Sequence, residues 1–336
     1  MHVSDALLSP AVGLGFHAAS AGLLGVTARR AAREEGYERR LPLMGVLGAF
    51  VFAAQMVTFA VPGTGSSGHL AGGLLLAILL GPSAAFLVMA SVLTVQALFF
   101  ADGGLLALGC NVFNLGFWPS FVGIALYRRI VRLAPGRGGV TVGAVAGAVV
   151  ALELGALGVA VQTALSGRAA VPLRELALLM AGVHLPVAVA EGLLTAGVVR
   201  LLSRAAPDRV EAARAARVPA LAALGGIALF TGTVAASFAS TRPDGLAWSL
   251  ARVARSAPAE HARGVGALLH RLQERLAVLP GYAFAGTERR AGIDPGTVAS
   301  GLAGTLLVAG LVLLVGGIVA GSRRALRSAR ERAPPP

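Results

Sequence analysis

The first two residues of the chain carry an unusual set of nitrogen donors. Met1 supplies an α-amine, and His2 supplies a backbone amide and an imidazole. If the His2 amide is deprotonated, the amine, the amide nitrogen and the ring Nδ1 can close two fused chelate rings around one ion. Three coplanar nitrogens suit the square-planar geometry of Ni(II) or Cu(II) better than the tetrahedral geometry of Zn(II). The start of the chain therefore predicts most of a metal site.

A fourth donor is offered by His69, which ends the Gly- and Ser-rich stretch Pro62–His69. Each histidine also has an ordinary explanation, because a second residue can be His by chance and a loop His usually faces solvent. The two become a pair only if the chain brings them to the same face of the molecule. The elements that surround them therefore decide between the two interpretations.

Composition indicates that these elements lie in a membrane. Of 336 residues, 56% are hydrophobic and 13% are charged, whereas soluble domains carry about 25% charged residues. The mean hydropathy is +0.75. These values exclude a soluble two-domain enzyme and a disordered chain. The single cysteine excludes an internal disulfide and a multi-cysteine metal cluster. We expect an all-α, polytopic membrane protein.

Eight apolar runs are candidates for crossing a membrane. The third run, Leu70–Phe100, would be about 46 Å long as one helix, against a hydrocarbon core of about 30 Å. Gly81-Pro82 interrupts it, and the residue before a proline is pushed away from helical geometry. We therefore split it and expect about nine transmembrane helices from the following runs: Ala6–Ala28, Leu41–Ala60, Leu70–Phe100, Leu105–Tyr127, Val140–Leu165, Leu176–Val199, Pro219–Ser240 and Thr297–Ala320.

The arginines support this division, and the chain contains no lysine. With the third run split, 19 arginines follow the first, fifth, seventh and ninth spans and lie on one side. The positive-inside rule makes that side cytoplasmic. The N-terminus and the stretch that ends at His69 are then both extracytoplasmic, and the C-terminus is cytoplasmic. Since topology accounts for the basic charge, a nucleic-acid partner is not expected.

Several other polar residues fall at membrane depth, where an unpaired polar group is costly and a functional role is the default hypothesis. Two roles are open for the amides among them: fixing the tautomer of a ligand histidine, or cross-linking helices. Asp102 lies beside them. Glu191 shares a helical face with His184, and Glu153 precedes both, so these three could be structural or could line an ion path. The residues considered as supports of the metal site are Gln96, Asp102, Asn111, Asn114 and Glu191.

At this point a family resemblance can be stated. The start Met1–Pro10 resembles the MHxxDGFLSP opening of the NikM/CbiM substrate-binding (S) components of energy-coupling-factor nickel and cobalt transporters. Further similar blocks are Ser67–Leu70, Gln96–Gly104, Leu108–Asn111 and Ala190–Gly192. In that family the metal is held by the N-terminal amine, the backbone and side-chain nitrogens of the second residue, and a loop histidine. The resemblance thus implies Met1, His2 and His69 as ligands. Ala6 and Cys110 depart from the pattern without touching a ligand.

The end of the chain resembles the small NikN/CbiN component, which has two spans around an outer loop. Arg242–Leu246 is similar to its PDGL start and Pro280–Phe284 to its PDYxF block, with Ala247 and Gly281 as departures. The expected organisation is a seven-helix S-component over residues 1–217 and a NikN-like module over residues 218–336, as in fused NikMN polypeptides.

The resemblance implies capture of Ni²⁺ or Co²⁺ outside a prokaryotic cytoplasmic membrane, with no catalytic residues and no organic cofactor. Expected partners are a transmembrane coupling protein (EcfT/NikQ/CbiQ-like), ATPase subunits (NikO/CbiO-like) and the lipid bilayer. The chain has no Walker motif, so energy must come from those partners. The alternative is a self-sufficient secondary transporter or channel for a cation or small metabolite, with Glu153, His184 and Glu191 as its path.

Overall fold

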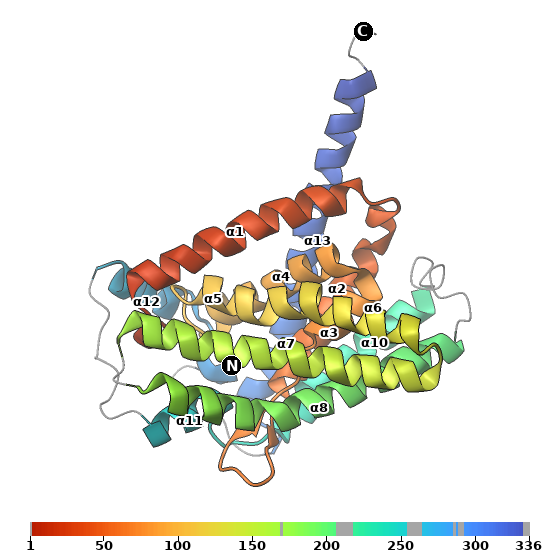
Figure 1. Ribbon diagram of the computed structural model, residues 1–336. Helices are drawn as coiled ribbons and strands as arrows, with labels where there is room; N and C mark the ends of the chain where they lie inside the picture. Colours follow the sequence, from red (N-terminus) through yellow and green to blue (C-terminus); the bar gives the residue numbers. More distant parts are fainter. Residues whose placement is uncertain are drawn as a thin grey trace.

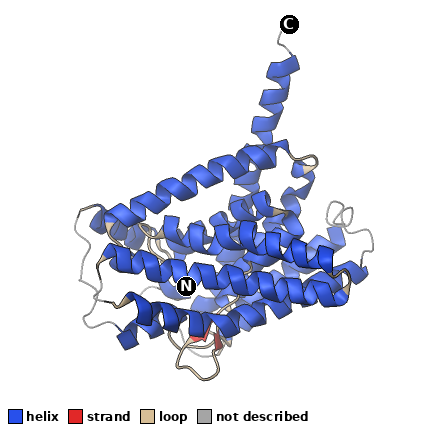
Figure 2. Cartoon of the chain, viewed as in Figure 1, coloured by secondary structure: helices blue, strands red, loops and turns tan. Residues whose placement is uncertain are grey.

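The computed structural model describes residues 2–168, 171–205, 218–253, 264–284, 287 and 292–331. These residues form a helical bundle with one small hairpin (Figures 1 and 2). A short 3₁₀ turn, η1 (Asp5–Leu7), leads into α1 (Pro10–Arg33), whose first turn is capped by the Ser9 side chain. α2 (Tyr37–Met56) returns across the bundle. The all-α membrane architecture expected from the composition is confirmed.

Residues 57–72 form the loop between α2 and α3, and we call them loop 57–72. The loop contains the two-residue strands β1 (Phe59–Ala60) and β2 (Ser67–Gly68), which pair in antiparallel register. His69 directly follows β2. The loop ends at α3 (Gly73–Leu80), which is followed without a gap in sequence by Gly81 and α4 (Pro82–Phe100).

The break at Gly81-Pro82 lies where the sequence predicts it. Gly81 has a φ of +86°, which favours glycine, and Pro82 opens the next helix at a position where no N–H is needed. The α3 helix is only 8 residues long, about 12 Å, which is too short to cross a membrane alone. Residues 70–72, which were expected to belong to this span, belong to loop 57–72 instead. The expected number of nine full spans is therefore approximate.

The remaining helices of the first region follow in sequence. α5 (Leu108–Val112), a π-helical stretch η2 (Phe113–Gly123) and α6 (Ile124–Leu133) make one continuous apolar segment. α7 (Arg137–Ser166) and α8 (Leu173–Ala205) form a long antiparallel pair with extensive contact. In Figure 1, α1, α7 and α8 run across the view in broadly similar directions.

The C-terminal region adds α10 (Val218–Phe230), η3 (Thr231–Ala235), α11 (Gly245–Val253), α12 (Val265–Leu276), η4 (Pro280–Tyr282) and α13 (Pro295–Glu331). The α13 helix packs mainly against α2 and extends beyond the rest of the bundle at its C-terminal end (Figure 1). Among the described residues, six helices are long and apolar enough to cross a membrane, and Leu221–Ala235 is a shorter apolar helix. This agrees with a multi-pass membrane protein.

Candidate metal centre

The N-terminal segment is held in place by hydrogen bonds at Val3, which is fully buried. The Val3 N–H donates to Asn111 Oδ1 at 2.8 Å, and Asn111 Nδ2 donates back to the Val3 carbonyl at 3.2 Å. The Gly104 N–H also donates to that carbonyl, at 3.0 Å. Both backbone groups of Val3 are therefore occupied, and the register of the first residues is fixed relative to α5.

Asp5 adds a second anchor two residues after Val3. Its Oδ1 accepts the Ala107 N–H at 2.9 Å, and burial raises the pKa of this carboxyl above its usual value. A Cβ atom on Gly104 would lie 1.8 Å from Asp5 Oδ1, so only glycine fits there without displacing Asp5. The segment around Gly104 and Ala107 is thus shaped around the N-terminus.

His2 and Asp102 form the closest charged contact of the site. His2 Nδ1 lies 3.0 Å from Asp102 Oδ1, and the His2 side chain is 8% exposed. The Tyr282 hydroxyl donates to the other oxygen, Asp102 Oδ2, at 2.5 Å. Burial alone would raise the pKa of the Asp102 carboxyl, but the charge and hydrogen bond of His2 and the bond from Tyr282 hold that pKa below its usual range. Asp102 is therefore an anion that orients the His2 ring.

His69 lies beside His2, although 67 positions separate them in sequence. The two rings stack with their centroids 5.5 Å apart and their planes 14° from parallel. His69 Nδ1 lies 3.0 Å from the Leu70 carbonyl, which can only accept, so Nδ1 donates and Nε2 keeps its lone pair. Burial lowers the pKa of His69 to about 4, so the ring is neutral at pH 7.

Two further nitrogens near His69 are available in the described part of the chain. His2 Nε2 is buried and has no hydrogen-bond partner there. The His2 backbone N–H likewise donates to no acceptor among the described residues, whereas the next amide, Val3, is taken by Asn111. Metal-binding histidines commonly donate their second ring nitrogen to a carboxylate or carbonyl, which is the arrangement at both rings.

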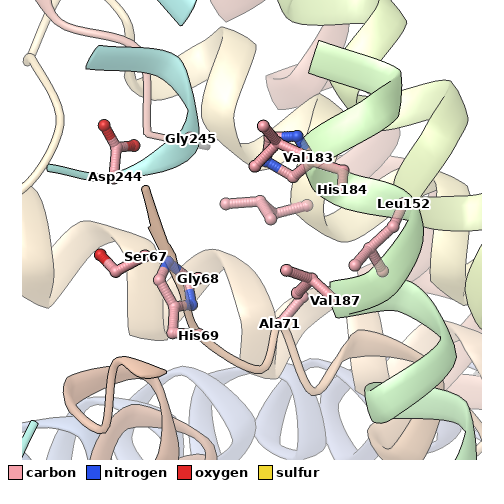
Figure 3. Close-up of a pocket in the computed structure, with 11 residues that line it drawn as sticks. Ser67, Gly68, His69, Ala71, Leu152, Val183, His184, Val187, Asp244 and Gly245 are labelled. Carbon is pink, nitrogen blue, oxygen red and sulfur yellow. The ribbon is translucent and has the colours of Figure 1, made fainter. Parts of the chain in front are cut away.

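A pocket of about 20 Å³ opens beside His69, which is room for about one water or one ion. His69 and Ser67 of loop 57–72 form one wall, and His184 and Val187 of α8 form another (Figure 3). The third wall, Asp244 and Gly245, comes from the start of α11. His184 is 5% exposed, and its Nδ1 bonds the Met180 carbonyl at 2.7 Å.

The other polar residues singled out from the sequence have different surroundings. Gln96 is fully buried and donates to Gln55 Oε1 at 2.7 Å, so it contacts no histidine. Asn114 exchanges two hydrogen bonds with Gln162 and cross-links η2 to α7. Glu191 accepts the backbone N–H groups of Ala71 and Gly72. Asp102 contacts His2 directly, and Asn111 acts on the backbone of Val3.

Met1 lies outside the described residues, so its amine cannot be located relative to His2 and His69. Among the described residues, no group of three or more His, Cys, Asp or Glu side chains could hold a metal ion. Side chains alone therefore do not make a complete site in this part of the chain.

The C-terminal region contributes residues that the sequence analysis did not assign to the metal site. Besides Tyr282, Gln273 of α12 donates to the Gly103 carbonyl at 2.6 Å and to the Ala97 carbonyl at 2.9 Å. On the opposite side, the Ser67 N–H donates to the Pro243 carbonyl at 2.8 Å, and Ser67 forms a parallel bridge with Asp244. The segment between η3 and α13 thus contacts loop 57–72, which carries His69, and also the loop that carries Asp102, the partner of His2.

The chain matches two known protein families. Residues 2–209 match the family described as the cobalt uptake substrate-specific transmembrane region (CbiM). The chain belongs to this family. Residues 219–321 match the PDGLE domain, which is the NikN-like part.

Individual relatives extend the match over both regions. A candidate fused nickel transport protein NikMN of Archaeoglobus fulgidus is 33% identical over 314 residues, which cover 93% of this chain and 96% of the relative. The cobalt transport protein CbiM of Geobacter sulfurreducens is 32% identical over 213 residues, covering 62% of this chain and 61% of the relative. A crystal structure of a transition metal transporter has a TM-score of 0.55 at 31% identity, covering 63% of this chain and 96% of that chain.

Proposed function

We propose that this chain captures Ni(II), or Co(II), outside the cell and is the substrate-specific component of an energy-coupling-factor transporter. The observation that carries the proposal is the contact between the rings of His2 and His69, together with the His2 amide, which donates to no acceptor among the described residues. The proposed ligands are the Met1 amine, the His2 amide nitrogen, His2 Nδ1 and His69 Nε2. Four nitrogen donors in one plane suit Ni(II).

The contact between His2 and Asp102 supports a specific way of admitting the ion. Nδ1 of His2 is bonded to Asp102, whereas the chelate needs Nδ1 to face the His2 amide. A half-turn of the ring about the Cβ–Cγ bond moves Nδ1 to the opposite edge and brings Nε2 toward Asp102. Asp102 then accepts the Nε2 proton while Nδ1 binds the ion, so the carboxylate supports the ring in both states.

The fixed register of the chain start makes this chelate specific. Because Asn111 and Gly104 hold Val3, the two backbone nitrogens proposed as ligands, those of Met1 and His2, directly precede an anchored residue. Shifting the sequence by one residue would leave a different amide at the site. A site built from side chains alone would lack this constraint.

The energy for uptake comes from partner subunits in this proposal. These partners would be a transmembrane coupling protein (EcfT/NikQ/CbiQ-like) and ATP-binding ATPase subunits of the NikO/CbiO kind. The N-terminus would be extracytoplasmic and the C-terminus cytoplasmic, in a prokaryotic inner membrane. We favour nickel over cobalt because relatives of fused organisation are named nickel transport proteins and because the proposed donors are four nitrogens.

The proposal is tested by the metal content of the purified full chain and by uptake in cells. We expect about one nickel per chain after exposure to nickel salts, and a loss of bound nickel in His2→Ala and His69→Ala. In cells, uptake should require a cognate ATPase subunit with an intact nucleotide site. Uptake by this chain without any ATPase would favour the secondary-transporter alternative and contradict the proposal.

The contacts of Glu153, His184 and Glu191 do not support an ion path. Glu191 is occupied by two backbone N–H groups and His184 Nδ1 by a carbonyl, and no hydrogen bond joins the three in the described part of the chain. Glu153 Oε1 is buried without a partner there. We therefore assign no transport role to this set.

A further inference from the structure

Glu191 is a carboxylate in the middle of α8 that the proposed metal ligands do not include. Its side chain is 1% exposed, and among the described residues it has no cationic partner. Instead, Oε2 accepts the Ala71 N–H at 2.7 Å and Oε1 accepts the Gly72 N–H at 3.1 Å. Burying a carboxylate is costly unless its oxygens are bonded. The two backbone N–H groups meet that requirement.

The residues that Glu191 holds directly follow the proposed ligand His69. Ala71 and Gly72 lie two and three positions after His69, just before α3 begins. Gln55 of α2 donates to the Ala71 carbonyl at 2.7 Å, so side chains from two helices hold both backbone groups of Ala71. The C-terminal end of loop 57–72 is therefore held by hydrogen bonds to both α8 and α2.

Further hydrogen bonds connect Gln55 to the residues beside His2. Gln55 Oε1 accepts from Gln96 Nε2 at 2.7 Å, and the Gln96 carbonyl accepts the Asp102 N–H at 3.0 Å. Asp102 in turn bonds His2. One continuous set of buried hydrogen bonds thus joins the backbone beside His69 to the carboxylate beside His2.

We propose that Glu191 is a positioning residue for His69. By holding the backbone of Ala71 and Gly72, Glu191 fixes the position of His69 as the fourth metal ligand. This inference rests on the proposed function. It assigns the conspicuous carboxylate of α8 to the geometry of the loop and not to ion conduction. A residue that only cross-linked helices would stabilise the protein without acting through His69.

The variant Glu191→Gln keeps the side-chain volume but sets an amide N–H against one of the two backbone N–H groups. We expect nickel affinity to fall roughly 10- to 100-fold, as is typical when a partner of a metal ligand is changed. Glu153→Gln is the matched control, because Glu153 is also a carboxylate within a long apolar helix, but its buried Oε1 has no hydrogen-bond partner among the described residues. The control should bind nickel as the native chain does.

A double-mutant cycle separates positioning from general stability. In a His69→Ala background, Glu191→Gln should cause less than about a twofold further loss in nickel affinity, because the ligand it positions is gone. An equal loss in both backgrounds, or no loss in the native background, would overturn the inference while leaving the ligand set intact. If His69→Ala itself binds nickel normally, the proposed function fails instead.

If Glu191→Gln does not fold, Gln55→Leu tests the same positioning of His69 through the Ala71 backbone. It removes the hydrogen bond to the Ala71 carbonyl from the opposite side. We expect the same direction of change and the same dependence on His69. A loss in Gln55→Leu that persists undiminished in the His69→Ala background would count against the positioning role.

Discussion

At the scale of single residues, the site depends on hydrogen bonds that leave particular nitrogens unpaired. Asn111 occupies the Val3 amide, Asp102 occupies one nitrogen of His2, and Leu70 occupies one nitrogen of His69. These bonds leave the lone pair of His69 Nε2 and the N–H of His2 without a hydrogen-bond partner among the described residues. Among the described residues, these bonds thus leave two of the proposed ligands accessible, whereas a third, His2 Nδ1, must first leave Asp102.

Tyr282→Phe tests whether the C-terminal region supports the ring of His2. The change removes the hydroxyl that donates to Asp102 Oδ2, so the carboxylate is less firmly oriented. We expect nickel affinity to fall about 2- to 10-fold, which is less than the roughly 1.5–3 kcal/mol that a hydrogen bond to a charged group contributes, because Tyr282 acts on the ligand only through Asp102. Titration calorimetry on the purified chain measures the effect.

Tyr37→Phe is the matched control for this substitution. The Tyr37 hydroxyl is buried and has no hydrogen-bond partner among the described residues, so its removal should leave nickel affinity unchanged. Equal affinities for Tyr282→Phe and the native chain would show that Asp102 does not need this donor.

The sequence predicts part of this residue-level arrangement. The donor set of residues 1 and 2 follows from covalent chemistry, so the proximity of His2 and His69 could be anticipated once the topology was assigned. Asp102 is among the residues expected to support the metal site, but the sequence offers the role of bonding an imidazole only to the neighbouring amides, whereas the structure has Asp102 beside His2. Asn114 and Gln96 could not be sorted from Asn111 by spacing, because their partners Gln162 and Gln55 come from distant helices.

At the scale of elements, the short helix α3 connects loop 57–72, which precedes it, to the Gly81-Pro82 turn, which follows it. Glu191 lies 18 residues into α8, about 27 Å from its start, and it binds the end of loop 57–72. The loop therefore reaches far along α8 before α3 begins. Arg40, one of the arginines near the start of α2, donates to the Leu80 carbonyl at 3.0 Å. The Gly81-Pro82 turn thus lies at the arginine-bearing end of α2.

Cysteine labelling tests the side on which this turn lies. We expect Pro82→Cys to resist a membrane-impermeant thiol reagent in intact cells and to react after permeabilisation. Pro62→Cys, at the exposed tip of loop 57–72, should react in intact cells. The native Cys110 is buried and gives little background. Rapid labelling of Pro82→Cys from outside would refute the assigned orientation.

The length of the apolar run and its Gly-Pro break were sufficient to predict where α3 ends. They could not predict where it begins, because residues 70–72 are as apolar as a helix requires. What excludes them from α3 is tertiary: Glu191 and Gln55 take the backbone groups of Ala71, and Gly72 has a φ of +74°.

At the scale of the whole molecule, the two sequence regions meet at the metal site. The boundary near residue 217 remains a prediction, but the segment between η3 and α13 contacts the site from two sides through Ser67 and Asp102. Because every proposed ligand precedes Gly72, the sequence suggests that residues 1–217 bind metal by themselves. The contacts of Tyr282 and Gln273 show that the later region also holds the loop that carries Asp102.

A disulfide trap checks this contact between the regions. Ser67 and Asp244 form a parallel bridge, a spacing that two cysteines can span. We expect Ser67→Cys combined with Asp244→Cys to cross-link on oxidation, so that a chain cut between residues 206 and 217 stays as one band until reduced. Either single variant should separate into two fragments. Two fragments from the oxidised double variant would show that the regions do not meet there.

The central claim is that the ion is held by the α-amine and the residue-2 amide together with imidazole nitrogens. The most direct measurement is nickel titration calorimetry on a chain with one Ala inserted between Met1 and His2, beside His2→Ala and His69→Ala. The insertion keeps every side chain and the anchors at Val3, but it moves the amine one residue out of the chelate. We predict that the insertion abolishes binding about as completely as His2→Ala, and that His69→Ala weakens it strongly. Near-native affinity in the insertion variant would contradict the chelate, whatever the histidine variants do.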